Sequence, residues 1–340
     1  MKILVTGGLG FIGSHTVVEL QNEGFEVVVI DNLSNSSINV LDGIVRISGV
    51  KPIYKNIDLR DKNSVQAFFL EHEDIEGVIH FAASKAVGDS VENPLLYYEN
   101  NISALVYLLQ ELQKKEEACL IFSSSCTVYG QAEKMPINEE APIQCAVSPY
   151  GNTKQIGEEI ITDVAKVSNI KAILLRYFNP VGAHPSAEIG ELPLGVPQNL
   201  VPFITQTGIG LRKELSVYGD DYPTLDGTAI RDYIHVVDLA KAHVSALQRL
   251  MAKKNIDKVE TFNVGTGKGS SVLEVIKAFE KISNQQLPYK IVGRREGDVV
   301  SAYADTNKVN QVLGWKSQFS LEEALASAWK WEQKIRKGKE

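Results

Sequence analysis

The stretch that decides the fold is MKILVTGGLGFIG, residues 1–13. Its apolar, β-branched run Ile3–Thr6 predicts a buried strand, and apolar residues at helical spacing over Phe11–Asn22 predict a helix. A G-x-x-G-x-x-G pattern stands between the two, formed by Gly7, Gly10 and Gly13. Glycines let the backbone turn tightly and approach a pyrophosphate, which the free N–H groups of a helix N-terminus can bind. The stretch therefore predicts a dinucleotide-binding turn.

The same alternation of strand and helix continues to about residue 180. Further strands are expected at Glu26–Ile30, Lys51–Ile57, Gly77–Phe81, Ala118–Ser123 and Ile170–Tyr177, and helices at Ser64–Glu71, Leu95–Lys114 and Pro149–Val167. Continuous β-branched runs separated by helices are typical of a parallel sheet covered on both faces. We therefore expect an α/β fold built on a doubly wound parallel sheet of the Rossmann type.

The character of the chain changes after Phe178. Five prolines and three glycines fall between residues 180 and 202, a composition typical of loops that line ligand sites. Helices are expected again at Val236–Lys253, Ser271–Ile282 and Leu321–Arg336. We predict a Rossmann domain over residues 1–180 and a smaller, mixed α/β substrate domain over residues 181–340, with room for some segments to return to the first domain.

Composition narrows the class of protein. The 340 residues are 44% hydrophobic and 23% charged, as in an ordinary globular chain. The net charge of −7 disfavours binding to nucleic acid or to an anionic membrane. The three cysteines, Cys119, Cys126 and Cys145, have no metal-ligand spacing, so no metal site is expected. The apolar run at the N-terminus is shorter than the roughly 7–15 residues of a signal peptide, so a cytoplasmic location is expected.

A carboxylate marks the end of the second predicted strand. Asp31 lies 18 residues after Gly13, where it can accept hydrogen bonds from the adenosine ribose. It would repel a 2′-phosphate, so the sequence favours NAD over NADP. Asp58 follows the third strand, where it could bind an adenine amino group or cap the next helix, a role for which Asp61 competes. Small residues after the fourth strand, Ala82 among them, let a cofactor pass closely.

A second constellation predicts acid–base chemistry. Tyr150 and Lys154 form a Y-x-x-x-K pair, which lies on one face of a helix. A nearby ammonium, together with the positive charge of an oxidised nicotinamide, would favour the phenolate of a tyrosine whose pKa is ordinarily about 10. Ser125, at the end of the fifth strand, could hold the reacting hydroxyl. Taken singly, a packed tyrosine and a polar strand end explain these residues equally well.

Together these motifs resemble the extended short-chain dehydrogenase/reductase superfamily, and within it the UDP-glucose 4-epimerase family. The resemblance runs from residue 1 to about residue 330. It rests on the glycine motif and on the blocks DNL at 31–33, KAVG at 85–88, SSSCTVYG at 123–130, SPYG at 148–151, RYFNPVGAH at 176–184 and RDYIHV at 231–236.

The resemblance implies an isomerase that interconverts UDP-galactose and UDP-glucose with tightly bound NAD. Tyr150 would take the proton from the sugar O4, and hydride would pass from C4 to the nicotinamide. The resulting 4-keto sugar would turn over and receive the hydride on its other face. Ser125, Tyr150 and Lys154 match the catalytic residues of the family, which is commonly homodimeric through the helices Leu95–Lys114 and Pro149–Val167.

The family's binding positions carry over residue by residue. The NAD site implied in this way comprises Gly7, Gly10, Phe11, Ile12, Gly13, Asp31, Asn32, Asn35, Asp58, Leu59, Phe81, Ala82, Lys85, Asn100, Ser123, Tyr150, Lys154 and Tyr177. The implied UDP-sugar site comprises Ser125, Tyr150, Asn179, Asn199, Leu200, Ser216, Tyr218, Arg231, Tyr233, Arg295, Asp298 and Ala302. The two arginines can offer planar forks to a diphosphate.

One departure from the family pattern bears on the substrate. The fourth residue past Asp298 tends to be tyrosine in members restricted to glucose and galactose, and cysteine or serine in members that accept N-acetylated sugars. Ungapped alignment puts Ala302 there, which predicts room for an acetamido group and activity on UDP-GalNAc and UDP-GlcNAc. A slip of one residue would put Tyr303 there instead.

Two other functions stay open at this point. A nucleotide-sugar 4,6-dehydratase needs an Asp-Glu pair after the catalytic hydroxyl residue, whereas Cys126-Thr127 follows Ser125 here. A protein that senses NAD without catalysis could dispense with Ser125, Tyr150 and Lys154, all of which are present.

Overall fold

The computed structural model describes residues 1–295 and 297–337. Its largest element is a seven-stranded, all-parallel sheet in the order β11-β6-β5-β4-β1-β2-β3. The strands are β1 (Lys2–Thr6), β2 (Glu26–Ile30), β3 (Ile53–Lys55), β4 (Ile75–His80), β5 (Ala118–Ser125), β6 (Ile170–Tyr177) and β11 (Val259–Val264). The order reverses direction at β1, as in a doubly wound dinucleotide fold. The predicted Rossmann sheet is confirmed.

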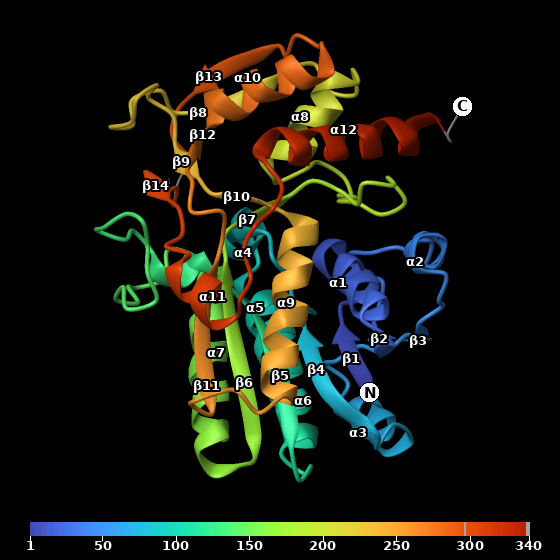
Figure 1. Ribbon diagram of the computed structural model, residues 1–340. Coiled ribbons are helices and arrows are strands. Elements are labelled where there is room, and N and C mark those ends of the chain that lie inside the picture. The colour runs from blue at the N-terminus through green and yellow to red at the C-terminus, as the bar shows by residue number, and fades with distance from the viewer. Residues whose placement is uncertain (296, 338–340) are drawn as a thin grey trace.

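Helices cover both faces of this sheet because its strands are apolar on both sides. One face packs against α1 (Phe11–Asn22), α2 (Val40–Ser48), α9 (Val236–Met251) and α11 (Asn307–Val312). The other packs against α3 (Lys62–Glu71), α6 (Ala104–Leu112) and α7 (Pro149–Val167). Figure 1 shows the sheet in the lower half of the molecule, with α9 lying in front of it and running along the strands.

The upper half in Figure 1 is a smaller α/β group with its own apolar core. It contains α8 (Leu200–Gly208), α10 (Val272–Ser283) and α12 (Leu321–Lys337), with the pair β8 (Leu215–Tyr218) and β13 (Tyr289–Val292). Two small sheets lie between the halves. One is β7 (Asn179–Val181) with β10 (Tyr233–His235), and the other is β12 (Ser270–Ser271), β9 (Ile230–Arg231) and β14 (Ser301–Ala302).

The later part of the chain contributes to both halves. α9 and β11 follow residue 180 in sequence, yet they pack on the Rossmann sheet. The division at residue 180 stays a prediction, and its last residues, 338–340, lie outside the described part of the chain, as does residue 296.

One predicted helix is wrong in its detail. The expected helix Leu95–Lys114 consists of α5 (Pro94–Tyr98), a π-helical turn η1 (Glu99–Ser103) and α6, and a separate short helix α4 (Val87–Glu92) precedes it. The π turn carries Asn101, whose side chain accepts from the Ser84 N–H at 2.8 Å and donates to the Ser84 carbonyl at 3.0 Å. A π turn inside a helix frequently marks a functional site, and this one fixes the loop that follows β4.

Within the described residues, no helix is both long and apolar enough to cross a membrane.

Candidate functional site

The glycine turn joins β1 to α1 at the carboxyl edge of the sheet. Gly7 has a φ of +68°, and a Cβ on it would lie 2.8 Å from the Ala82 amide nitrogen. A Cβ on Gly13 would overlap the Gly7 carbonyl oxygen and approach the Gly8 Cα to 2.9 Å. Gly10 is the N-cap of α1 and provides no side-chain cap for its N–H groups. The turn thus leaves a helix N-terminus for an anion to approach.

Asp31 is built into the same edge. Its carboxylate is buried and accepts hydrogen bonds from the Leu9 N–H at 3.0 Å, the Leu33 N–H at 2.9 Å and the Ser36 hydroxyl at 2.7 Å. These bonds fix the carboxylate beside the glycine turn. Its position suits hydrogen bonding to a ribose, and its negative charge would repel a 2′-phosphate on that ribose.

Asp58 does not cap a helix. Its carboxylate receives Arg60 Nη2 at 2.7 Å and Asn32 Nδ2 at 3.3 Å, and the hydrogen bond with Arg60 lowers its pKa to about 2. Asp61 is the N-cap of α3, accepting from the Asn63 N–H at 3.1 Å. The competition that the sequence left open is therefore settled in favour of Asp61 as the cap.

The remaining predicted cofactor residues separate into two groups. The first group lies at or just after the carboxyl ends of β4 and β5 and contains Phe81, Ala82, Lys85 and Ser123. Asn100 is near them, since its side chain donates to the Ser84 hydroxyl at 3.1 Å. Asn35 is exposed in the loop after β2, and the Leu59 side chain is buried in the core beneath the sheet. Leu59 can therefore offer a ligand its backbone rather than its side chain.

The three predicted catalytic side chains meet beside β5. Ser125 is the last residue of β5 and caps the 3₁₀ turn η2 (Cys126–Tyr129), accepting from the Thr127 N–H at 3.2 Å. Tyr150, 7% exposed, lies in the first turn of α7, which Ser148 caps and Pro149 begins. Tyr150 lies close enough to Ser125 for the Ser125 hydroxyl to affect the pKa of its phenol. Lys154 Nζ donates to the Ser123 carbonyl at 2.7 Å and lies 5.8 Å from the Tyr150 ring centroid.

Burial dominates the ionisation of this cluster. It raises the pKa of the Tyr150 phenol, which the nearby Ser125 hydroxyl lowers in part. It lowers the pKa of Lys154 to about 8, against an opposing effect of the Glu158 charge. The phenolate expected from the sequence therefore depends on the charge of an oxidised nicotinamide and is not produced by Lys154 by itself.

Several of the predicted UDP-sugar residues lie on the short strands between the two halves of the molecule. Tyr233 of β10 is in register with Asn179 of β7. Arg231 of β9 pairs with Asp298 at 3.3 Å and is close enough to Cys126 to affect the pKa of its thiol. Arg295 shares a turn with Asp298, whose N–H donates to the Arg295 carbonyl at 3.2 Å.

Strand pairing separates the two gate candidates. Ala302 of β14 is in register with Arg231 of β9, so both side chains project from the same face. Ala302 packs in a small apolar cluster that includes Val128 and Tyr129 of η2. Tyr303 projects to the opposite face, where its ring would meet a Cβ placed on Gly269 at 3.1 Å.

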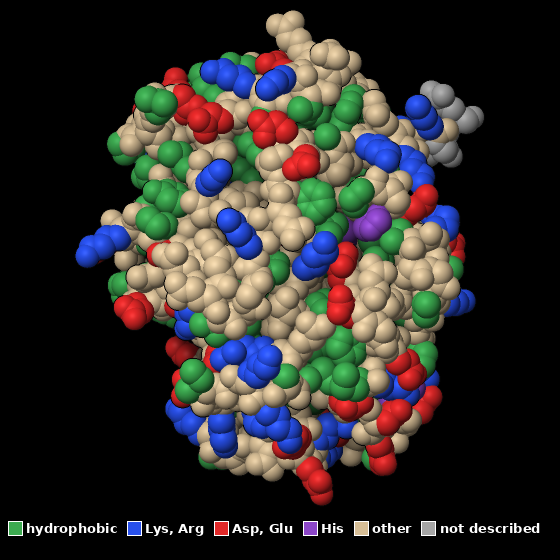
Figure 2. Space-filling model, in the orientation of Figure 1, with side chains coloured by type: hydrophobic (Ala, Val, Ile, Leu, Met, Phe, Trp, Pro, Cys, Tyr) green, Lys and Arg blue, Asp and Glu red, His purple; other side chains and the backbone are tan. Residues whose placement is uncertain are grey.

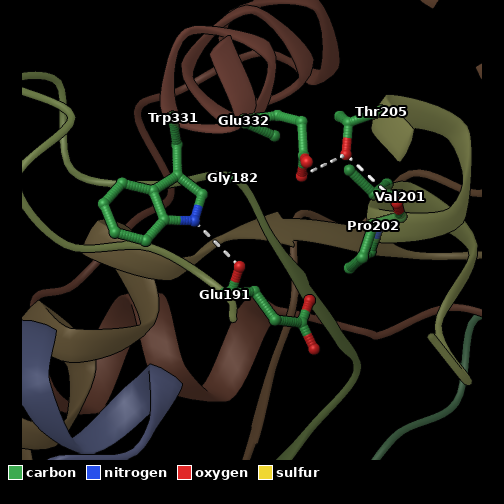
Figure 3. A pocket seen from close by; sticks show the side chains of 8 residues that line it. Gly182, Glu191, Val201, Pro202, Thr205, Trp331 and Glu332 are labelled. Carbon is green, nitrogen blue, oxygen red and sulfur yellow. Dashed lines mark hydrogen bonds between the residues drawn. The ribbon is translucent and has the colours of Figure 1, made fainter. Parts of the chain in front are cut away.

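A carboxylate connects the two predicted ligand sites. Glu191 Oε1 receives Lys85 Nζ at 3.3 Å and Asn199 Nδ2 at 2.7 Å. Figure 3 shows the Trp331 indole N–H directed at the Glu191 carbonyl oxygen, 2.9 Å away, on the wall of a cavity beside the site. Leu200 begins α8 just after Asn199. Ser216 and Tyr218 lie on β8, which belongs to a different sheet from β5, the strand that ends with Ser125.

One functional feature escaped the sequence analysis. Glu158, one turn after Lys154 on α7, is buried against Arg176 of β6, with Arg176 Nη2 at 2.5 Å and Nε at 2.9 Å from its carboxylate. Ser124 donates to the same carboxylate at 2.5 Å, and Arg176 Nη1 contacts the Tyr129 hydroxyl at 3.0 Å. The i, i+4 spacing of Lys154 and Glu158 was the available sequence signal.

The exterior shows mixed charge. Figure 2 shows acidic and basic side chains interspersed over the face in view. Within residues 1–295 and 297–337, no group of three or more His, Cys, Asp or Glu side chains is arranged to hold a metal ion.

Comparison with known proteins gives consistent matches over the whole length. A family model described as GDP-mannose 4,6 dehydratase matches residues 4–328. A UDP-glucose 4-epimerase of Bacillus subtilis is 49% identical over 333 residues, which make up 98% of this chain and 97% of that protein. The crystal structure of UDP-glucose-4-epimerase from Stenotrophomonas maltophila with bound NAD and formylated UDP-arabinopyranose has a TM-score of 0.95 and 47% identity, covering 99% of both chains. That of UDP-glucose 4-epimerase from Bifidobacterium longum in complex with NAD+ and UDP has a TM-score of 0.93 and 45% identity, covering 99% of this chain and 100% of the other.

Proposed function

This chain belongs to the UDP-glucose 4-epimerase family and catalyses NAD-dependent epimerisation of UDP-hexoses at C4; from that premise we propose which residues do the work and which sugars are accepted. Tyr150 is the acid/base that takes the proton from the sugar O4 and returns it. The observation that carries this assignment is the placement of the buried Tyr150 at the start of α7, close enough to Ser125 for that hydroxyl to lower its pKa in part, with Lys154 Nζ 5.8 Å from its ring centroid.

The cofactor residues fit NAD. The backbone at Gly7 and Gly13 is too close-packed for any side chain, which leaves the α1 N-terminus for the pyrophosphate. Asp31 is held by three hydrogen bonds, where it would accept from the adenosine ribose. When bound, NAD accepts the hydride from the sugar C4 and gives it back.

The protein groups position and move the proton. Ser125 orients the sugar O4 and links it to Tyr150. Lys154, fixed on the Ser123 carbonyl, places a positive charge beneath Tyr150 that favours its phenolate. Arg231 and Arg295 would bind the diphosphate, and Asp298 would accept from the uridine ribose, as the family positions imply.

The sugar pocket has room for a 2-acetamido group. Ala302 shares a face with Arg231 and packs beside η2, whereas Tyr303 projects away from that face. A methyl side chain at Ala302 supports turnover of UDP-GalNAc and UDP-GlcNAc in addition to the plain sugars.

We also propose a homodimer. Val91, Leu95 and Leu96 of α4 and α5 are exposed, Leu95 at 81%, and α5 packs beside α7. An exposed apolar group on two adjacent helices is typical of a subunit interface. Sedimentation velocity would show a species of twice the 37.4 kDa chain mass, or exclude it.

The cytoplasmic location stays a prediction, and it is supported by the three free cysteines.

The experiment that tests the function uses the purified enzyme without added NAD. UDP-galactose and UDP-GalNAc are incubated separately, and the products are resolved by NMR. Conversion of both is expected. Conversion of UDP-galactose alone would refute the open pocket at Ala302. Conversion of neither, even with NAD supplied, would refute the activity on these sugars and favour another substrate or a regulatory role.

A further inference from the structure

The catalytic helix α7 is joined to the sheet through one buried ion pair. Glu158 lies one helical turn below Lys154 and faces β5 and β6. Its carboxylate accepts from Arg176 through both Nε and Nη2, a two-point contact that fixes the direction of both side chains. Both residues are more than nine-tenths buried.

The partners of this pair lie next to the catalytic residues in sequence. Ser124, which donates to Glu158 at 2.5 Å, precedes Ser125. Arg176 precedes Tyr177, whose hydroxyl is 2.5 Å from the Ser123 hydroxyl, and Ser123 provides the carbonyl that receives Lys154. The contacts therefore hold α7, the end of β5 and the end of β6 at fixed distances from one another.

The same network reaches η2 and the strand at the sheet edge. Arg176 Nη1 contacts the Tyr129 hydroxyl at 3.0 Å, and that hydroxyl donates to Asn263 Oδ1 at 2.7 Å. Asn263 lies on β11. Because Tyr129 ends the turn that Ser125 begins, this branch fixes the backbone on the far side of the catalytic serine.

Charge distinguishes Glu158 from its neighbours. Other titratable groups face Lys154 or Tyr150 from the surrounding elements: His80 of β4, Tyr97 of α5, Cys126 of η2 and Tyr177 of β6. Burial lowers the pKa of His80 to about 3 and raises the pKa values of Cys126 and Tyr177 to about 12, and it also raises that of Tyr97. Among the described groups around Lys154, the Glu158 carboxylate is the one whose charge raises the pKa of Lys154.

We propose that Glu158 and Arg176 are positioning residues for the epimerisation: the pair aligns Tyr150 and Lys154 with Ser125, and Glu158 supplies the negative charge that keeps Lys154 an ammonium ion. The proposal rests on the proposed function, since it acts through Tyr150 and Lys154. It assigns to a buried ion pair a role in the ionisation of the site as well as in its geometry.

The test compares pH profiles of kcat and kcat/KM for the holoenzyme with UDP-galactose. Glu158→Gln keeps the shape of the side chain and removes its charge. Because that charge favours the protonated Lys154, its loss should lower the pKa of Lys154. The part of the profile that reports Lys154 should move to lower pH by about one unit, the lower end of the effect of a neighbouring opposite charge.

A second, partly buried ion pair provides a control. Arg249 and Glu260 make an equally close two-point contact between α9 and β11, with Nε at 2.7 Å and Nη2 at 2.9 Å from the carboxylate. Glu260→Gln should lower stability in a similar way and leave the pH profile where it is. Glu158→Asp, which retains the charge on a shorter side chain, should lower kcat with a smaller shift of the profile.

The outcomes separate the possible roles. A loss of kcat in Glu158→Gln that is equal at every pH would overturn the proposal and leave the pair a purely structural role. An equal shift in Glu260→Gln would overturn it as well. If Glu158→Gln does not fold, the double variant Glu158→Gln/Arg176→Gln, which leaves neither charge unpaired, should shift the profile in the same direction. Failure of the underlying function is distinguishable, because it would appear as full activity in Tyr150→Phe.

Discussion

Replacing Ala302 with tyrosine should separate the plain UDP-hexoses from the N-acetylated ones. Ala302 is 7% exposed, shares its face with Arg231, and has the η2 residues Val128 and Tyr129 in its cluster. Because Ala302 is already packed in this cluster and we propose that the sugar lies beside the same face, a phenol ring on this side chain would extend toward the sugar. It would then occupy the volume that we assign to the acetamido group.

The magnitude follows from the cost of overpacking. An acetamido group exceeds a hydroxyl by a whole acetyl group, and forcing extra atoms into a filled site costs about 1–3 kcal/mol. At about 1.4 kcal/mol per factor of ten, the kcat/KM for UDP-GalNAc should fall by about 5- to 150-fold relative to UDP-galactose. The ratio between the two substrates is the quantity of interest, since it cancels any general loss of active enzyme.

The assay measures initial rates with both substrates for the wild type, Ala302→Tyr and Tyr303→Ala. Tyr303→Ala is the matched control because its side chain projects from the opposite face, against Gly269. It should leave the substrate ratio unchanged. Thermal unfolding of each variant checks that the cluster around Ala302 still folds.

Two results would refute the reasoning. An unchanged substrate ratio in Ala302→Tyr would mean that this position does not face the sugar. A gain of UDP-GalNAc turnover in Tyr303→Ala would show that the pocket is closed by Tyr303, and that the register of β14 assigned here is wrong.

Three further predictions concern the proton, the cofactor and pH. Tyr150→Phe should lower kcat by about 10²–10⁴-fold while its NAD content stays constant; a rate near that of the wild type would contradict the acid/base role. Gly13→Ala should reduce the NAD that copurifies with the protein, measured by absorbance after heat release, because its Cβ would press on Gly7 and Gly8; Gly293→Ala, with nothing within 4 Å of its Cβ, is the control, and equal NAD in both would count against the turn. Burial lowers the pKa to about 3 or 4 in four histidines, His15, His80, His235 and His243. In the unfolded chain their pKa values return to near 6.5, so below about pH 6.5 the unfolded chain binds up to four more protons than the folded protein. Their contribution to stability is therefore complete above pH 6.5 and declines below it, by about 5 kcal/mol per pH unit near pH 5; a urea midpoint equal at pH 7 and pH 5 would contradict this.

Local patterns predicted the elements that local interactions determine. The bounds of α1, β2, α7 and β6 agree with those expected from the sequence. α7 shows why: Ser148 accepts from the Gly151 N–H at 3.1 Å and Pro149 fixes the first turn, so residues 148–151 determine where the helix begins.

Features that depend on distant partners were not predictable in this way. In the π turn η1, Asn101 is hydrogen-bonded to Ser84, which lies in the loop before α4 and α5. The hydrophobic periodicity of residues 95–114 gives no indication of that contact. The short helices α2 and α8 and the strand β11 also lay outside the expectations. From the sequence, Glu158 is indistinguishable from an exposed glutamate on a helix. Its pairing with Arg176 arises because the fold places β6 beside α7.

The same reasoning applies to the site. The spacing of Tyr150 and Lys154 and the glycine turn identified the chemistry, because each motif is compact in sequence. The alignment could not decide whether Ala302 or Tyr303 lies beside the sugar, because a shift of one residue moves each side chain to the other face of a strand. That distinction depends on the pairing of β14 with β9, some 70 residues earlier in the chain.

The place of β11 in the sheet has a consequence for the protein while it is being made. β6 is complete when Tyr177 has left the ribosome, but the strand that covers its outer edge ends at Val264. At the usual rate of synthesis of about 5–20 residues per second, that edge waits about 4–17 s for its partner. During this interval the nascent chain presents an apolar strand with free backbone N–H and C=O groups, a template on which another chain can pair. The order in which the strands are synthesised, rather than the stability of the folded protein, thus determines how long this edge is exposed to aggregation.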